Sequence, residues 1–488
     1  MAQSELHSRA GASRRPFLIL LIVFLLTLPL LNPWVRGDGV GYYALARAPL
    51  IQHNLDFRED FLHANASLRA RSLESNGQIN GAFLTSTGHI SNHFSVGPAI
   101  LWSPFLLVAH GGVLVARSLG SAVAADGFSR PYRIAMALGT AFYGFLGLWI
   151  AFCLARIYVD ETWALIAAFA VWFATSLPVY MYFNPSWSHA HSAFVVALFV
   201  WYWHGTRESR SLLQWLILGA IAGLMLNIYY PNAMVMLGLL GIEALDAYAT
   251  AFRGTSGTKP GFGRLLLSHV MFVAVTLLCL LPTFLTRAII FGSPFASGYI
   301  PLSRWNWTSP SFVAVLFSSE HGLLSWTPLI LLSLIGLAFF WRQVPRVGSA
   351  FLAAVIAFYY FIASYPDWTG ISSFGNRFFV SLTVFFVLGL AILLQHAASL
   401  FRRRSAAIAF STAVLALFSL WNCGLIFQWG SHLIPARGPV SWSEVWYNQF
   451  AVVPHQLSSE LHAYLFHRKE LMHTIEQRDL QQLEKNQQ

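Results

Sequence analysis

Long apolar segments, many about as long as a bilayer is thick, alternate along this chain with short clusters of basic residues. Residues 134–155 are one such segment, and a helix needs roughly 20 apolar residues to cross a bilayer. Only 10% of the 488 residues are charged, against roughly 25% in soluble chains, which is too little polar surface for a water-exposed globule. The segments do not show the alternation of a membrane β-barrel. We therefore predict an all-α, polytopic integral membrane protein.

The basic clusters predict the topology, because cytoplasmic loops of membrane proteins are enriched in Lys and Arg. Pairs of apolar segments separate successive clusters, and the turn within each pair is not basic. If residues 17–35 exit the cytoplasm and Arg156 lies inside, an odd number of crossings must lie between them. We therefore interpret residues 96–116, which contain Pro98 and Pro104, as a re-entrant or interfacial helix. The count is then about eleven to twelve transmembrane helices. The clusters are Arg9/Arg14/Arg15, Arg156, Arg207/Arg210, Arg253/Lys259/Arg264, Arg342/Arg346 and Arg402/Arg403/Arg404.

This topology divides the chain into three parts. Residues 1–16 form a cytoplasmic stub, and the apolar segment after them is interpreted as an uncleaved signal anchor, because no small-x-small cleavage site follows it. Residues 17–427 form the transmembrane domain, with a large first outer loop at 36–95 and a second outer loop at 290–325. Residues 428–488 form a polar C-terminal tail, whose charged stretch 467–488 is helix-like and expected to be solvated or flexible.

The net charge of +10 does not indicate nucleic-acid binding, because topology explains the positions of the basic residues. The three cysteines lie inside apolar segments without metal-ligand spacing. Composition therefore directs attention to the polar residues on the predicted outer turns.

The first outer loop opens with Asp38, followed by the aromatic pair Tyr42 and Tyr43. An acidic residue at the membrane boundary is well placed to meet an acceptor group, and the aromatic pair to contact a substrate. Alternatively, Asp38 is an N-cap that accepts backbone N–H bonds from a helix beginning at Gly39. Residues 42–51 read as a helix lying in the membrane interface.

Six outer segments together resemble the GT-C membrane glycosyltransferases, which take sugars from polyprenyl-phosphate carriers. Relatives include protein O-mannosyltransferases, lipid A aminoarabinose transferases and bacterial proteins with an Rgt-like domain. The segments are Gly37-Asp38-Gly39-x-Gly41-Tyr42-Tyr43, Asn92-His93-Phe94-Ser95-x-Gly97-Pro98, Asn184-Pro185-Ser186-Trp187-Ser188-His189-Ala190, Phe291-Gly292-Ser293-Pro294-x-x-x-Gly298-Tyr299, Glu320-His321-Gly322-Leu323-x-Ser325-Trp326-Thr327-Pro328 and Asp367-Trp368-x-Gly370-x-x-Ser373-Phe374-Gly375-x-Arg377.

The resemblance implies that Asp38 is the general base of an inverting sugar transfer at the outer face of the cytoplasmic membrane. The donor would be a polyprenyl-phosphate sugar, the acceptor a glycan, lipid or protein, and the surroundings membrane lipids. In aminoarabinose-type relatives a second acid follows a Pro on the turn after the third span. Here Ser186 follows Pro185, with His189 nearby, so cooperation of two carboxylates at that place is in doubt.

Other outer residues are candidates for donor or cation binding. Arg377 suits the leaving phosphate, with a membrane-snorkelling Arg as the alternative. Arg304 and Trp305 suit a sugar or lipid headgroup, with an aromatic belt as the alternative. We expect one outer cavity with an apolar groove opening to lipid, lined by Asp38, His93, His189, Glu320 and Arg377. A divalent cation could be held by carboxylate and imidazole groups, and the candidate ligands are His93, His189, Glu320 and His321.

Two other functions are compatible with the sequence. A transporter or flippase for a lipid-linked saccharide needs ionisable residues within the spans, whereas Asp and Glu here gather on the predicted outer side. A non-catalytic relative that only binds carriers is the third hypothesis, because the second acid is missing.

Overall fold

The computed structural model describes residues 14–252, 261–296 and 298–485, with side chains up to residue 481. Every regular element in this part of the chain is helical, and pairing between extended segments is limited to two isolated bridges. The prediction of an all-α fold is confirmed for these residues. Most of the predicted stub, the basic residues Arg253 and Lys259, and the last three residues of the tail lie outside the described residues.

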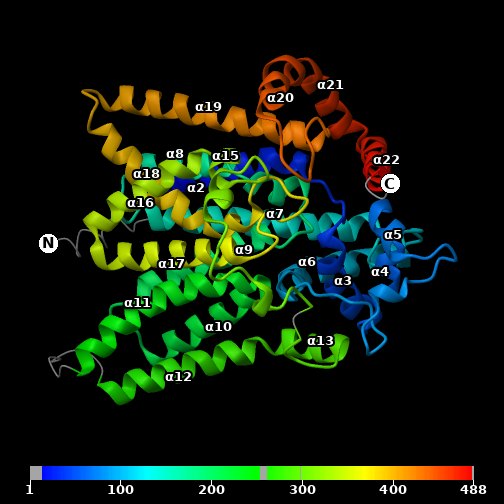
Figure 1. The fold of residues 1–488 in the computed structure, drawn as a ribbon, viewed down its shortest axis with the longest axis horizontal. Helices are drawn as coiled ribbons and strands as arrows, with labels where there is room; N and C mark the ends of the chain where they lie inside the picture. Colours follow the sequence, from blue (N-terminus) through cyan, green and yellow to red (C-terminus); the bar gives the residue numbers. More distant parts are fainter. Residues whose placement is uncertain (1–13, 253–260, 297, 486–488) are drawn as a thin grey trace.

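The chain folds into a bundle whose helices run lengthwise, with most of the other helices gathered at one end (Figure 1). The bundle consists of α2 (Arg14–Thr27), α7 (Arg130–Ala155), α8 (Glu161–Phe173), α9 (His189–Thr206), α10 (Leu212–Ile228), α11 (Ala233–Phe252), α12 (Phe262–Cys279), α16 (Leu329–Gln343), α17 (Pro345–Ser364), α18 (Thr383–Ala398) and α19 (Arg404–Gly430). The other helices, besides α6 described below, are α3 (Asp38–Arg47), α4 (Arg58–Leu62), α5 (Ala66–Ser72), α13 (Leu281–Phe291), α14 (Phe312–Phe317), α15 (Leu323–Trp326), α20 (Trp442–Tyr447), α21 (Val453–Phe466) and α22 (Arg468–Lys485).

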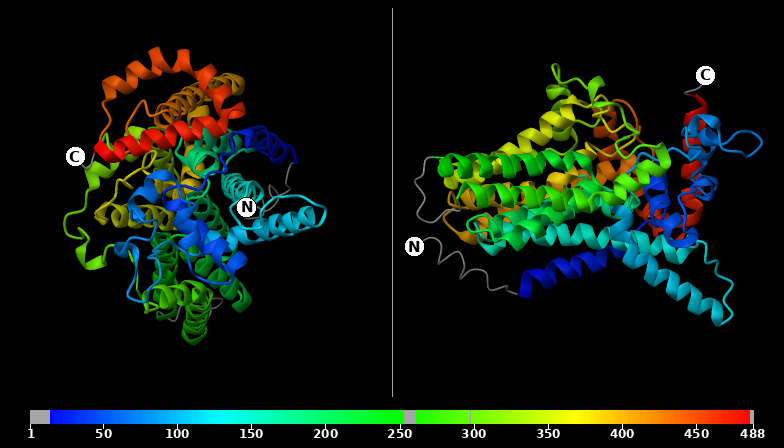
Figure 2. Two further views of the ribbon diagram at one scale, coloured as in Figure 1. Left: turned by 90° about the vertical axis from the view of Figure 1, so that its right-hand side faces the viewer. Right: turned by 90° about the horizontal axis from the view of Figure 1, so that it is seen from below.

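Seven helices in the described residues are long and apolar enough to cross a membrane, and four shorter helices are also apolar. The seven are Gly97–Ser118, Arg130–Ala155, Tyr230–Phe252, Phe262–Cys279, Pro345–Ser364, Arg377–Ala398 and Arg404–Gly430. The first is α6 (Gly97–Ser118), one continuous helix despite Pro104 inside it. Its second half leaves the bundle at an angle (Figure 2), and Val108 and Leu119 on it are largely exposed. Residues 96–116 therefore contain no re-entrant break.

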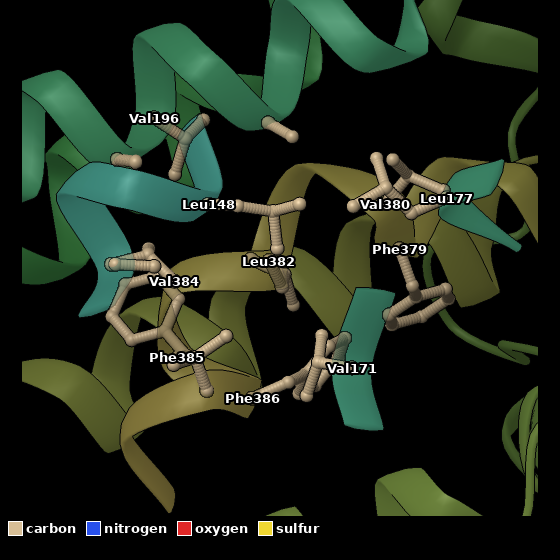
Figure 3. Close-up of a cluster of buried hydrophobic side chains, with 14 of the residues drawn as sticks. Leu148, Val171, Leu177, Val196, Phe379, Val380, Leu382, Val384, Phe385 and Phe386 are labelled. Carbon is tan, nitrogen blue, oxygen red and sulfur yellow. The ribbon is translucent and has the colours of Figure 1, made fainter. Parts of the chain in front are cut away.

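Helix α18 is the centre of the core, because it is apolar on all sides and almost entirely buried. Figure 3 shows Val384, Phe385 and Phe386 at its start, packed against Leu148 of α7 and Val171 of α8. Helix α16 crosses α18 at Gly336, where a Cβ atom would lie 1.7 Å from the backbone oxygen of Gly389. Close packing of the two helices therefore requires glycine at this crossing.

The two ends of the bundle differ in chemistry. At one end Asp160, before α8, lies 3.4 Å from Arg404, and Gln343 of α16 bonds His396 of α18 at 2.8 Å. The turns after α7, α16 and α18 therefore share this end, where α2 begins (Figure 1). The opposite end carries α3 to α5, α13 and α20 to α22. Positively charged turns and the candidate catalytic residues thus lie at opposite ends, as the basic clusters predict.

Two segments differ from their predictions. Residues 42–51 do not form the exposed amphipathic helix that the prediction describes: from Gly39 to Arg47, α3 is buried against other parts of the protein, and Arg47 forms a buried ion pair with Asp60 at 2.6 Å. The described part of the tail is not simply solvated either, since α21 and α22 pack against the segment before α3. Both segments carry enough apolar or hydrogen-bonding surface to be buried within the protein.

Candidate active site

A cavity of about 280 Å³ opens at the end of the bundle that carries α3. Its volume is near the lower end of small-molecule sites, which run from about 300 to 1,000 Å³. Segments far apart in the sequence converge on it, and its walls are mostly aromatic. The lining residues are Asp38, Tyr42, His93, Phe94, His189, Tyr229, Tyr230, Pro231, Gly298, Tyr299, Ile300, Trp305, Phe361, Ile362, Tyr365, Asp367, Gly370, Ile371, Arg377 and Phe378.

Asp38 is the first residue of α3 and is aimed at the cavity rather than at its own helix. The cap position belongs to Gly37, whose φ of +54° is readily adopted by glycine, and no side chain caps the helix there. The Asp38 carboxylate accepts a hydrogen bond from Arg377, with 2.7 Å between Oδ2 and Nη1. The structure therefore favours a role in the cavity over the N-cap alternative.

The glycines around Asp38 allow α3 to approach its neighbours closely. A Cβ atom on Gly39 would lie 2.0 Å from Ser186 Oγ, and one on Gly41 would lie 2.1 Å from the ring of Phe94. Any larger residue at either position would push the start of α3 away from these neighbours. The spacing of glycines after Asp38 thus has a physical cause, namely the close seating of the helix that carries the carboxylate.

Arg377 is held between the acid and an aromatic ring. Its guanidinium carbon lies 4.4 Å from the ring centroid of Trp187, and its side chain is only 12% exposed. Its Nε is buried without a hydrogen-bond partner in the described residues. Gly370 lies beside it, where a Cβ atom would come within 3.0 Å of Nε. Arg377 therefore keeps donor capacity for an anionic ligand while it pairs with Asp38.

The aromatic pair of the sequence separates in the structure. Tyr42 lines the cavity and its hydroxyl accepts a hydrogen bond from Ser188 at 3.0 Å. Burial raises the pKa of Tyr42 to about 12, so the phenol is protonated at neutral pH. Tyr43 points elsewhere and donates to the backbone oxygen of Gly127 at 2.6 Å.

Trp305 and Arg304, which the sequence analysis assigned to one binding role, have different positions relative to the cavity. Trp305 is buried, lies 4.8 Å from Tyr365 between ring centroids, and lines the cavity. Arg304 is exposed on a short turn and does not line it. An aromatic wall of this kind offers stacking surface to the apolar face of a sugar.

The four candidate metal ligands do not come together. His93 and His189 line the cavity, whereas Glu320 and His321 do not. His321 Nδ1 lies 2.8 Å from the backbone oxygen of Thr369, and burial lowers the pKa of His321 to about 4. Within the described residues no three His, Cys, Asp or Glu side chains are grouped so as to hold a metal ion.

Burial also lowers the pKa of His93 at the cavity wall, so this imidazole is neutral at pH 7. Its ring lies 4.6 Å from that of Tyr299. A neutral imidazole can donate one hydrogen bond and accept another, which suits contact with ligand hydroxyls.

Sequence reasoning missed a second carboxylate and most of the tyrosines. Asp367 lines the cavity, and in the described part of the chain no basic side chain forms an ion pair with it. Tyr229, Tyr230, Tyr299 and Tyr365 also line the cavity. The position of Asp367 on the same outer turn as Arg377 was the available signal, whereas tyrosines at helix ends are indistinguishable from a membrane-interface belt.

Comparisons with known proteins add no relative: no family model matches the chain, and no curated protein matches it significantly.

Proposed function

We propose that this chain is a membrane glycosyltransferase of the GT-C architecture. It would transfer a sugar from a polyprenyl-phosphate carrier to an acceptor hydroxyl on the outer face of the cytoplasmic membrane. The observation that carries the proposal is the contact between Asp38 and Arg377 in an aromatic cavity at the end of an apolar bundle. A base and a phosphate-binding cation side by side are the two groups that this transfer needs.

The membrane would cross the bundle with the cavity at the outer boundary. Eleven helices of the described chain, α2, α7 to α12 and α16 to α19, would then span it, whereas α6, which leaves the bundle at an angle, would not. This number lies within the predicted range of about eleven to twelve. Arg156, Arg210, Arg342 and Arg403 would face the cytoplasm, and Asp38, Asn92 and Arg377 the outside. The carrier's phosphate would reach the cavity while its chain stays in lipid.

The Asp38 carboxylate would take the proton of the acceptor hydroxyl. The hydroxyl oxygen forms a bond to the anomeric carbon, on the face opposite the phosphate. The bond from that carbon to the phosphate oxygen breaks, and its electron pair leaves with the phosphate. The new negative charge lies beside the guanidinium of Arg377, whose unpartnered Nε can donate to it.

Asp367 and the aromatic wall would orient the sugar. Trp305 and Tyr365 offer flat apolar surfaces, and the Asp367 carboxylate offers acceptors for sugar hydroxyls. The carboxylate missing after Pro185 would thus have a counterpart on a different turn. This supports the enzyme over a relative that only binds carriers.

The experiment that tests the proposal is incubation of the purified protein with bacterial lipid extract, followed by mass spectrometry of the co-purifying lipids. We expect a polyprenyl-phosphate sugar to co-purify with the wild type, and much less of it with Arg377→Gln. Arg304→Gln is the matched control, because Arg304 lies outside the cavity. Equal recovery with all three proteins, or recovery of no phosphate-bearing carrier, would contradict the proposal.

A further inference from the structure

The segment between α2 and α3, residues 28–36, is held along its length by the C-terminal helices. Arg468 donates to the backbone oxygen of Pro29 at 2.8 Å and also to that of Leu31. Tyr464 donates to the backbone oxygen of Leu30 at 2.8 Å. These bonds join α21 and α22 to the chain that leads directly into Asp38.

Asp479 on α22 forms the last of these contacts, with Arg36, which lies two residues before Asp38 in the chain. Its carboxylate lies 3.3 Å from Arg36 Nη2 and 3.1 Å from His432 Nε2, and it is 16% exposed. The ion pair is therefore mostly shielded from water, where charge–charge contacts are stronger than at an open surface. Figure 1 shows α22 beside α5, on the same end of the molecule as α3.

From Arg36 the contacts continue into the cavity. The Arg36 backbone oxygen accepts a hydrogen bond from the Trp187 indole at 3.1 Å. The guanidinium of Arg377 in turn lies over the Trp187 ring. On the other side, the Gly37 N–H donates to Asn65 Oδ1 at 3.0 Å, and Asn65 precedes α5, which packs on α22. Arg36 and Gly37, the two residues before Asp38, are thus both linked to the tail.

We propose that α22 is a positioning element of the active site and that Asp479, through Arg36, sets the position of Asp38 relative to Arg377. Gly37 has wide conformational freedom, so the segment before it needs an outside support to keep α3 in place. A displacement of about 1 Å at a reacting group can cost about 100-fold in rate. The inference rests on the proposed function for its effect on rate, but its structural part does not.

The test compares Asp479→Asn with the control Glu470→Gln, an acid-to-amide change on the same helix at a side chain that is 83% exposed. Hydrogen exchange is measured over residues 32–45, together with kcat and KM for sugar transfer from a polyprenyl-phosphate hexose. We expect faster exchange at residues 36–41 and a kcat about 10- to 100-fold lower in Asp479→Asn, with KM nearly unchanged. Asp479→Glu should restore most of both, and Arg36→Gln should act like Asp479→Asn without adding to it.

The outcomes separate the two proposals. Unchanged exchange at residues 36–41 in Asp479→Asn would overturn the positioning role, whatever the activity. Faster exchange in a protein whose wild type transfers no sugar would support the positioning role and count against the proposed function alone. A lower melting temperature with unchanged kcat in the folded fraction would assign Asp479 a purely structural role and overturn the inference.

Discussion

Replacing Asp38 by Asn separates the chemistry of the carboxylate from its contribution to the fold. Asn keeps the size of the side chain and an oxygen that accepts a hydrogen bond from Arg377, but it cannot take a proton at neutral pH. If Asp38 is the general base, sugar transfer should fall by about 10²–10⁴-fold, the usual contribution of such a group. The substrate KM should change much less than kcat.

The cost in stability follows from the burial of the ion pair. Arg377 is 12% exposed and Asp38 is 34% exposed, so the pair lies between surface pairs, which contribute about 0–1 kcal/mol, and buried pairs, whose loss costs about 3–5 kcal/mol. We expect about 1–2 kcal/mol for Asp38→Asn, which lowers the melting temperature of the detergent-solubilised protein by a few degrees at most.

The matched control is Asp56→Asn in the same outer loop, because the Asp56 side chain is 51% exposed and its ion pair among the described residues is with the exposed Arg58. Both variants are assayed for initial rates of sugar transfer alongside their melting curves. Transfer by Asp38→Asn within a factor of about three of the wild type, in a folded protein, would refute the assignment of Asp38 as the base.

Three further predictions follow from particular contacts. Gly39→Ala places a Cβ atom 2.0 Å from Ser186 Oγ and should displace α3, lowering both transfer rate and stability (by about 1–3 kcal/mol), whereas Gly81→Ala, with open space around it, should change neither. Trp305→Ala should raise KM for the donor about 10-fold with little change in kcat, which steady-state kinetics would show. Burial lowers the pKa of His321 to about 4 in the folded protein, below the ~6.5 of an exposed imidazole, so the unfolded chain binds the proton first as the pH falls. Melting curves should therefore show that up to about 3 kcal/mol of stability is present above pH 6.5 and lost toward pH 4. His321→Asn should flatten this pH dependence.

Much of the fold was predictable because helix length and apolar composition are local properties of the chain. The basic clusters around Arg156 and Arg342 also indicate which turns share an end, since charge asymmetry is visible without tertiary structure. The packing of α22 on residues 28–36 was not predictable. A charged helix that buries Ile475 and pairs Asp479 with Arg36 has the same composition as one that is solvated.

The candidate site was predictable in part for a similar reason. Asp38, Arg377 and His189 stand at the starts of helices on predicted outer turns, and they share the cavity. Glu320 and His321 also lie on an outer turn, but neither lines the cavity, and His321 instead bonds the backbone of the loop that carries Gly370. Sequence position indicates the end of the bundle on which a residue lies, whereas side-chain direction depends on long-range packing.

The most direct test of the central claim is the stereochemistry of a single transfer. The purified wild type is incubated with a polyprenyl-phosphate hexose of known anomeric configuration, labelled with ¹³C at the anomeric carbon, and with the acceptor fraction of a bacterial lipid extract. We predict a labelled glycoside of inverted configuration by NMR, together with free polyprenyl phosphate, and neither product with Asp38→Asn. A product of retained configuration, or transfer by Asp38→Asn at the wild-type rate, would contradict the account.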